Sequence, residues 1–127
     1  IKKIIDYFNF IETTRVRIHK SNPGHKIKLH TDDNNTHAKV DTDFRLRMIT
    51  ALNHDSDFIY TYEYNGVLHK IDLKQGESII FDPDKVKHGL INQSKDKVRY
   101  ALVQIFKAYP IDKRLVDFMN KNETVVL

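Results

Sequence analysis

Cysteine is absent from the sequence, which excludes both a disulfide framework and a metal site built on thiolates. Any metal site in this chain must therefore use histidines, carboxylates or hydroxyls. No apolar run is long enough to cross a membrane, and the opening segment, interrupted by Asp6 and Asn9, does not resemble a secretory leader. We therefore expect a cytoplasmic protein that makes no membrane contact.

No repeat, low-complexity segment or linker divides the 127 residues, so we expect a single domain over 1–127. The chain opens on isoleucine rather than methionine, as a chain lacking N-terminal residues would. The net charge is +4, but lysines are spread from Lys2 to Lys121 without the clusters that track a phosphate backbone. We therefore expect no nucleic-acid partner, whereas the positive potential would suit a small dianionic ligand.

Short segments with the alternating pattern of β-strands follow one another, and turn residues divide them. One turn holds Asn65-Gly66, the strongest short signal for a β-hairpin. We expect strands over residues 14–20, 25–32, 44–53, 57–64, 68–74, 78–82, 87–93 and 98–107, and flanking amphipathic helices over 1–11 and 112–121. About eight antiparallel strands predict a mainly β jelly roll or related barrel, and an α+β roll on a smaller sheet is the alternative.

His30 and Asp32 close the second expected strand, where a period of two places both side chains on the face opposite Ile27 and Leu29. Taken alone, the pair could equally be a polar turn at a strand end. A further histidine, His88, opens the seventh expected strand. Two histidines and one carboxylate form the facial triad of non-haem iron, which leaves positions open for substrates. The sequence therefore predicts a metal site of these three residues.

Arg99 opens the last expected strand, on a face that it shares with Val103 and Ile105. Burying an unpaired guanidinium is costly, so we expect an anion beside it. Its forked donors match a carboxylate at two points, which suits a dicarboxylate co-substrate. An ordinary ion pair with Asp82 or Asp84 is the alternative.

Together, His30-Thr31-Asp32, His88 and Arg99 resemble the His-x-Asp…His…Arg pattern of the Fe(II)/2-oxoglutarate-dependent oxygenases. The stretch FDPDKVKHGLINQSKDKVRYALVQIF is similar to the C-terminal half of the prolyl hydroxylase-like and aspartyl/asparaginyl hydroxylase-like branches. GHKIKLHTDDNN and FRLRMITALN resemble the first-ligand strand and the strand after it. Asp32 favours the prolyl hydroxylase-like branch, since the other branch often has glycine there, although many prolyl hydroxylases have lysine in place of Arg99.

The resemblance spans about residues 13–107 and implies a double-stranded β-helix. It implies that His30, Asp32 and His88 bind Fe(II), that Arg99 holds the distal carboxylate of 2-oxoglutarate, and that ascorbate is an accessory reductant. The reaction would hydroxylate a C–H bond of a peptide, amino-acid-like or other small-molecule substrate and release succinate and CO2. The alternatives are a non-redox, cupin-like metal- or ligand-binding domain and an interaction module with a vestigial site. Cupins generally use more histidines and a glutamate.

Two further pairs of residues are candidates for binding the co-substrate. Arg45 and Arg47 lie on one face of the third expected strand, where related enzymes sometimes add a second basic group. Protection of an edge strand by charge is the alternative. Tyr60 and Tyr62 alternate along the fourth expected strand. Their hydroxyls could contact 2-oxoglutarate or substrate, and cross-strand aromatic packing is the alternative.

Overall fold

The computed structural model describes residues 13–32 and 45–107, and within these ranges every regular element is a β-strand. The strands are β1 (Thr13–Ser21), β2 (Lys26–His30), β3 (Arg45–Ala51), β4 (Phe58–Tyr64), β5 (Val67–Ile71), β6 (Ser78–Phe81), β7 (Lys87–Asn92) and β8 (Arg99–Lys107). Each expected strand is found, with ends shifted by a few residues. The expected flanking helices lie outside the described residues. A search of the same ranges finds no helix with the length and hydropathy of a membrane span.

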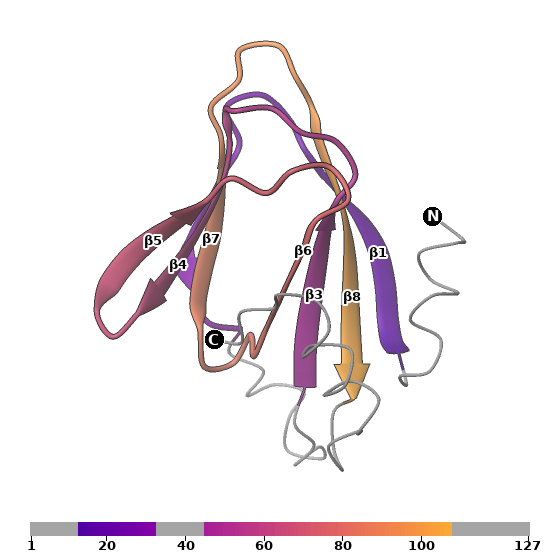
Figure 1. The fold of residues 1–127 in the computed structure, drawn as a ribbon, viewed down its shortest axis with the longest axis vertical. Coiled ribbons are helices and arrows are strands. Elements are labelled where there is room, and N and C mark those ends of the chain that lie inside the picture. The colour runs from indigo at the N-terminus through magenta and orange to yellow at the C-terminus, as the bar shows by residue number, and fades with distance from the viewer. Residues whose placement is uncertain (1–12, 33–44, 108–127) are drawn as a thin grey trace.

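The strands form two antiparallel four-stranded sheets, in the orders β1-β8-β3-β6 and β2-β7-β4-β5. Figure 1 shows β3, β8 and β1 on the right and β4, β5 and β7 on the left. The chain moves from one sheet to the other at almost every connection, and only β4 and β5 follow each other within a sheet. Two facing sheets joined in this way are the architecture of a jelly roll, which confirms the mainly β prediction.

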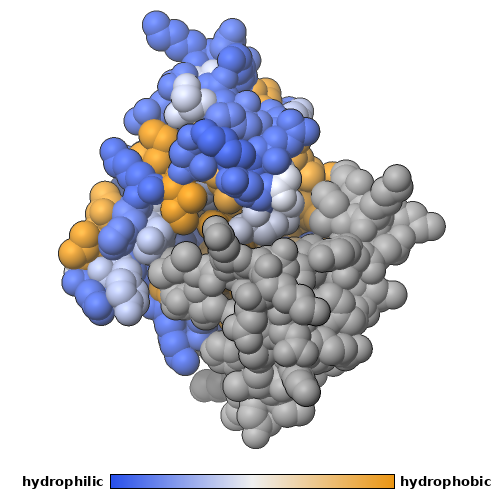
Figure 2. All heavy atoms as spheres, in the orientation of Figure 1, coloured by the Kyte–Doolittle hydropathy of each residue, from blue (hydrophilic) through white to orange (hydrophobic). Residues whose placement is uncertain are grey.

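The β4–β5 hairpin turns at Asn65 and Gly66, whose φ angles are 49° and 75°. Positive φ at both central residues is the requirement of the type I′ turn that the sequence predicted. Tyr64, Val67 and Leu68 at its tip are all more than half exposed. Val67 and Leu68 are aliphatic, and Figure 2 shows hydrophobic surface on the left, the side on which the hairpin extends in Figure 1.

The interior between the sheets has an apolar part and a polar part. Buried Ala51, Tyr60 and Leu73 form a cluster with the partly buried side chains of Ile49, Ile71 and Ile79. Arg47 lies near the start of β3 and His88 near the start of β7, whereas Ala51 and Asn92 end these two strands. Arg47 and His88 therefore lie away from the end of this cluster marked by Ala51, whereas His19 lies in the same row of the sheet as Ala51.

Asn92 fixes the turn that separates His88 from Arg99. The side chain is fully buried, and its Nδ2 donates to the carbonyl oxygens of Ser21 and Lys97 at 3.0 and 2.9 Å. Its Oδ1 accepts a hydrogen bond from the backbone N–H of Ser94 at 3.0 Å. Buried amides need such partners, so Asn92 ties β1 to the connection between β7 and β8.

A bulge in β2 aims His30 at the interior. Ile27 pairs with Leu90 and His30 pairs with His88, so Lys28 and Leu29 together oppose the single residue Gly89. The extra residue brings both Ile27 and His30 to the interior cavity. The expectation that His30 faces away from Ile27 is therefore wrong, because it assumed an unbroken period of two.

Gly89 lets β2 approach β7 closely, and replacing it with alanine should damage both the fold and the site. A Cβ there would lie 2.7 Å from the carbonyl oxygen of Ile27 and 3.0 Å from Thr61 Oγ1. We expect Gly89→Ala to lower the free energy of unfolding by about 1–3 kcal/mol, as measured by urea denaturation, and to weaken divalent metal binding by moving His30 away from His88.

Gly66→Ala is the matched control, because a Cβ there meets no atom within 4 Å although φ is +75°. It should lower stability through backbone strain and leave metal affinity unchanged. Equal losses of metal affinity in the two variants would show that the close approach at Gly89 does not position His30.

Candidate metal centre

His30, Asp32 and His88 meet at one end of the interior. One donor atom from each residue can be chosen so that all lie within 4.8 Å of one another. Asp32 Oδ1 is 3.4 Å from His30 Nε2 and 3.5 Å from His88 Nε2. His30 ends β2 and pairs directly with His88 near the start of β7, and Asp32 follows β2. Two imidazole nitrogens and one carboxylate oxygen are suitable donors for a divalent transition metal.

Hydrogen bonds to the backbone orient both imidazoles. His30 Nδ1 is 2.8 Å from the carbonyl oxygen of Lys28, and His88 Nδ1 is 2.9 Å from that of Val86. A carbonyl can only accept, so in both rings Nδ1 carries the proton and Nε2 keeps its lone pair. Metal-binding histidines are typically held in this way. The rings therefore present Nε2 toward Asp32, which fits the requirements of a metal site.

The guanidinium of Arg47 binds two of the three candidate ligands. Its Nη2 donates to Asp32 Oδ2, and its Nη1 donates to His88 Nε2 at 3.2 Å. Burial alone would raise the pKa of the Asp32 carboxyl, but the nearby His88 imidazole and the charge of Arg47 outweigh it and hold the pKa below its usual range. Asp32 therefore offers Oδ1 to the histidines and Oδ2 to Arg47. A metal ion would compete with Arg47 only for His88 Nε2.

A cavity of about 540 Å³ opens beside these residues. Its volume lies within the range of roughly 300–1,000 Å³ that is common for small-molecule sites. Among its described lining residues are four arginines and a single acid, Asp32. The lining side chains divide into a polar set, Arg15, Arg17, His19, His30, Asp32, Arg47, Tyr60, His88 and Arg99, and an apolar set, Ile27, Ile49, Pro83, Leu90, Val103 and Ile105. The cavity therefore favours an anionic ligand.

Arg99 is buried in the cavity wall without a carboxylate partner in the described part of the chain. The side chain is 2% exposed, and burial lowers its pKa to about 10. Its guanidinium carbon lies 4.1 Å from the centre of the Tyr60 ring, and Nη1 is 3.4 Å from His19 Nδ1. The Tyr60 hydroxyl is also buried, with no hydrogen-bond partner among the described residues. A buried cation beside a hydroxyl without a partner is an arrangement that an anion would complete.

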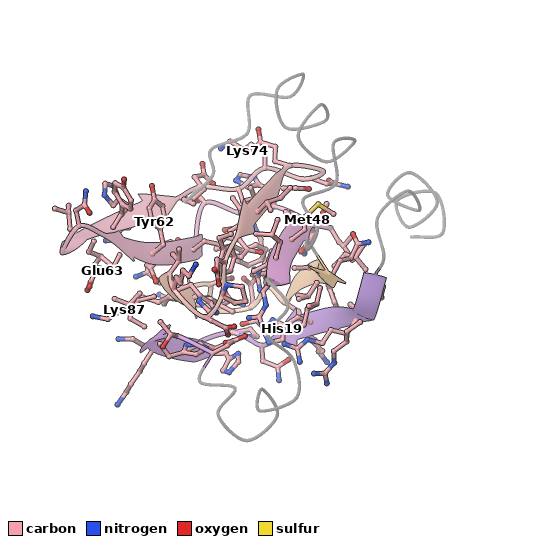
Figure 3. The ribbon with its side chains drawn as sticks, turned by 90° about the horizontal axis from the view of Figure 1, so that it is seen from below. His19, Met48, Tyr62, Glu63, Lys74 and Lys87 are labelled. Carbon is pink, nitrogen blue, oxygen red and sulfur yellow. The ribbon has the colours of Figure 1, made fainter. Side chains whose placement is uncertain are left out.

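The remaining sequence candidates are placed differently. Tyr62 lies on the same face of its sheet as His88, with which it pairs across β4 and β7, but it stacks on His69 at 4.8 Å and does not line the cavity. In Figure 3 it lies on the hairpin side, away from His19 on β1. The side chain of Arg45 lies outside the described residues. The Asp82 carboxylate, one alternative partner for Arg99, instead contacts Lys85 Nζ at 3.4 Å.

Three polar lining residues were not among the sequence candidates. Arg15, Arg17 and His19 alternate along β1 and all face the cavity. The burial of His19, followed by the charges of Arg99 and Arg17, lowers the pKa of its imidazole. Their alternation was visible in the sequence. However, only the pairing of β1 with β8 shows which face of the strand turns inward.

Several solved structures share this fold. A 2OG-Fe(II) oxygenase family oxidoreductase from Burkholderia pseudomallei has a TM-score of 0.60 and 15% identity, covering 85% of this chain and 50% of that chain. A Pseudomonas putida prolyl-4-hydroxylase has a TM-score of 0.60 and 18% identity, covering 79% and 55%. A cupin domain from Bordetella pertussis has a TM-score of 0.51 and 18% identity, covering 76% and 84%.

These similarities establish a fold that oxygenases and cupins have in common, the double-stranded β-helix. The chain spans about half the length of the two oxygenase chains. No protein-family model and no curated protein matches the sequence. Because the fold serves both groups, the choice between them depends on the chemistry of the cavity.

Proposed function

We propose that the protein is a non-haem Fe(II)- and 2-oxoglutarate-dependent dioxygenase that hydroxylates a C–H bond of a peptide or amino-acid-like substrate, with release of succinate and CO2. The observation that carries this proposal is that the His30, Asp32 and His88 donor set shares a cavity with buried Arg99, which has no carboxylate partner among the described residues. His30, Asp32 and His88 would hold the iron. When bound, the metal would supply the activation of dioxygen and of 2-oxoglutarate.

The spacing of the two groups suits a short diacid. Tyr60 pairs with Leu90, which lies two residues along β7 from His88. Side chains two residues apart on one face of a strand are separated by roughly 7 Å. Arg99, over the Tyr60 ring, would bind the distal carboxylate through its forked donors, and the Tyr60 hydroxyl would donate to the same carboxylate. The other end of the diacid would then reach the row of His30 and His88.

Other lining residues would prepare the site for this reaction. Arg47 neutralises Asp32 and keeps its carboxylate in one orientation. The aliphatic side chains of Ile49, Leu90 and Val103 line the cavity and would exclude water around the bound diacid, which strengthens the ion pair with Arg99.

Arg47 also favours a second candidate, a non-redox cupin-like binding domain. Its guanidinium already satisfies Asp32 Oδ2 and His88 Nε2, as a cation would in a site that works without metal. In that case the arginine-rich cavity would bind an anionic ligand and perform no oxidation. Succinate formation from 2-oxoglutarate separates the two candidates, because a cupin-like domain can bind metal but performs no oxidation.

The deciding experiment measures metal binding and succinate formation on the same preparation. The Co(II)-loaded protein should show ligand-field absorption, and the Fe(II) protein should convert 2-oxoglutarate to succinate in air without added substrate. Ascorbate should prolong this turnover, and omission of iron or oxygen should abolish it. Absence of both the Co(II) spectrum and succinate would contradict the oxygenase proposal and favour the cupin-like domain.

A further inference from the structure

The inner face of β1 carries cations where an interior face normally carries apolar side chains. Arg15, Arg17 and His19 face the cavity, whereas Val16 and Ile18 point away from it and are 39% and 50% exposed. Inward charge can protect an edge strand from pairing with another chain. Charges at successive inward positions, with aliphatic residues turned outward, indicate instead that this face serves the cavity.

The strand register places Arg15 and Arg17 beside the candidate metal centre. Arg15 pairs with Ile105, which pairs in turn with Arg47 on β3. Arg15, Ile105 and Arg47 therefore form one row across the inner face of the sheet. Arg17 lies in the next row, with Val103 and Ile49. Both arginines are exposed at the cavity mouth, unlike Arg99 in the wall.

The charges in the cavity are not balanced by iron and 2-oxoglutarate. Among the described lining residues there are four arginines and one aspartate, and Arg47 already binds that aspartate. The two charges of Fe(II) would cancel the two of the 2-oxoglutarate dianion, so the charges of Arg99, Arg15 and Arg17 would remain. Arg99 would contact a carboxylate of the co-substrate, whereas Arg15 and Arg17 at the mouth would face no anion from the described lining.

We propose that Arg15 and Arg17 bind an anionic group, a carboxylate or a phosphate, on the substrate that is hydroxylated. This inference rests on the proposed function, because it assigns Arg99 to the co-substrate and the β1 pair to the substrate. Arginine forks bind either anion at two points, and placing the anion at the mouth leaves the rest of the substrate to extend toward His30 and His88.

The test uses Mn(II) in place of iron, with saturating 2-oxoglutarate, so that no turnover occurs. Each anionic probe is paired with a neutral one: phenylacetate with phenylacetamide, which is of similar size, and phenyl phosphate with phenol, which lacks the phosphoryl group. Paramagnetic relaxation of the probe protons reports binding near the metal. We expect relaxation of at least one anionic probe and of neither neutral probe. The anion that binds more tightly identifies the substrate group as a carboxylate or a phosphate.

The Arg15→Ala/Arg17→Ala double variant should lose at least about tenfold in affinity for the anionic probe and keep its affinity for 2-oxoglutarate. Lys70→Ala/Lys95→Ala removes the same charge from exposed residues that do not line the cavity, and should bind the probe normally. Equal relaxation of neutral and anionic probes, or unchanged probe binding by the double variant, would overturn the inference. Loss of 2-oxoglutarate affinity in the double variant would overturn it too.

Failure of Mn(II) or 2-oxoglutarate to bind would contradict the proposed function rather than the anion site. The backbone amide shifts of ¹⁵N-labelled protein, titrated with phenyl phosphate and phenylacetate, would then still test the β1 pair. Shift changes at β1 that disappear in the arginine double variant would support the site. Their absence from the unmodified protein would overturn it.

Discussion

Replacing His88 with alanine should abolish stoichiometric binding of divalent metal. The substitution removes one of three donors and also releases Arg47 Nη1, which donates to His88 Nε2 at 3.2 Å. Loss of a group that merely supports a ligand typically costs about 10–100-fold in metal affinity, so loss of the ligand itself should cost more than about 100-fold. Titration with Co(II), followed by absorption and calorimetry, measures this directly, and succinate formation should disappear with the metal.

His54→Ala is the matched control for this variant. His54 also contacts a carboxylate, with Nε2 at 2.7 Å from Asp72 Oδ1, but it belongs to no group of metal donors among the described residues and does not line the cavity. The His54→Ala variant should bind Co(II) with the affinity of the unmodified protein. Thermal unfolding without metal would confirm that both variants fold. If the His88 variant bound Co(II) at full affinity, the assignment of His88 as a metal donor beside His30 and Asp32 would be wrong.

The eight strands could be predicted from the sequence because each depends on local properties, an alternating pattern and the turn residues that end it. The turn at Asn65-Gly66 was predictable for the same reason, since few residues accept positive φ at both positions. The strand order could not be predicted in this way. β1 pairs with β8 across most of the chain, and nothing local to either strand specifies that pairing.

The candidate site was likewise predictable from the sequence only in part. His30, Asp32, His88 and Arg99 were nominated from their spacing and from a family resemblance, and the structure brings all four to one cavity. The bulge opposite Gly89 was not predictable, because it arises from a contact between β2 and β7.

The two arginine features beside these residues also depend on the folded structure. The contact of Arg47 with Asp32 requires two distant segments to meet. The inward direction of Arg15 and Arg17 depends on the pairing of β1 with β8, which an alternating basic pattern alone leaves open.

Arg99→Met should stabilise the protein without ligand and weaken its binding of 2-oxoglutarate. Burial lowers the pKa of Arg99 in the folded protein to about 10, below its ordinary value, so the charged side chain opposes folding at every pH below about 10. Replacing buried charged groups with apolar side chains of similar size is often neutral or stabilising by about 1–4 kcal/mol. We therefore expect a urea midpoint equal to or above that of the unmodified protein.

The same substitution should reduce affinity for 2-oxoglutarate by at least about 30-fold, since truncating one partner of a buried charge pair costs about 2–5 kcal/mol. A ligand at a hundred times its Kd stabilises a protein by about 2.7 kcal/mol. Denaturation with and without 2-oxoglutarate should show this gain in the unmodified protein and not in Arg99→Met. Arg99→Lys, which keeps the charge but not the fork, should retain part of it. A methionine variant that is less stable alone yet fully stabilised by 2-oxoglutarate would mean that Arg99 is a structural cation, and that another arginine of the cavity holds the diacid.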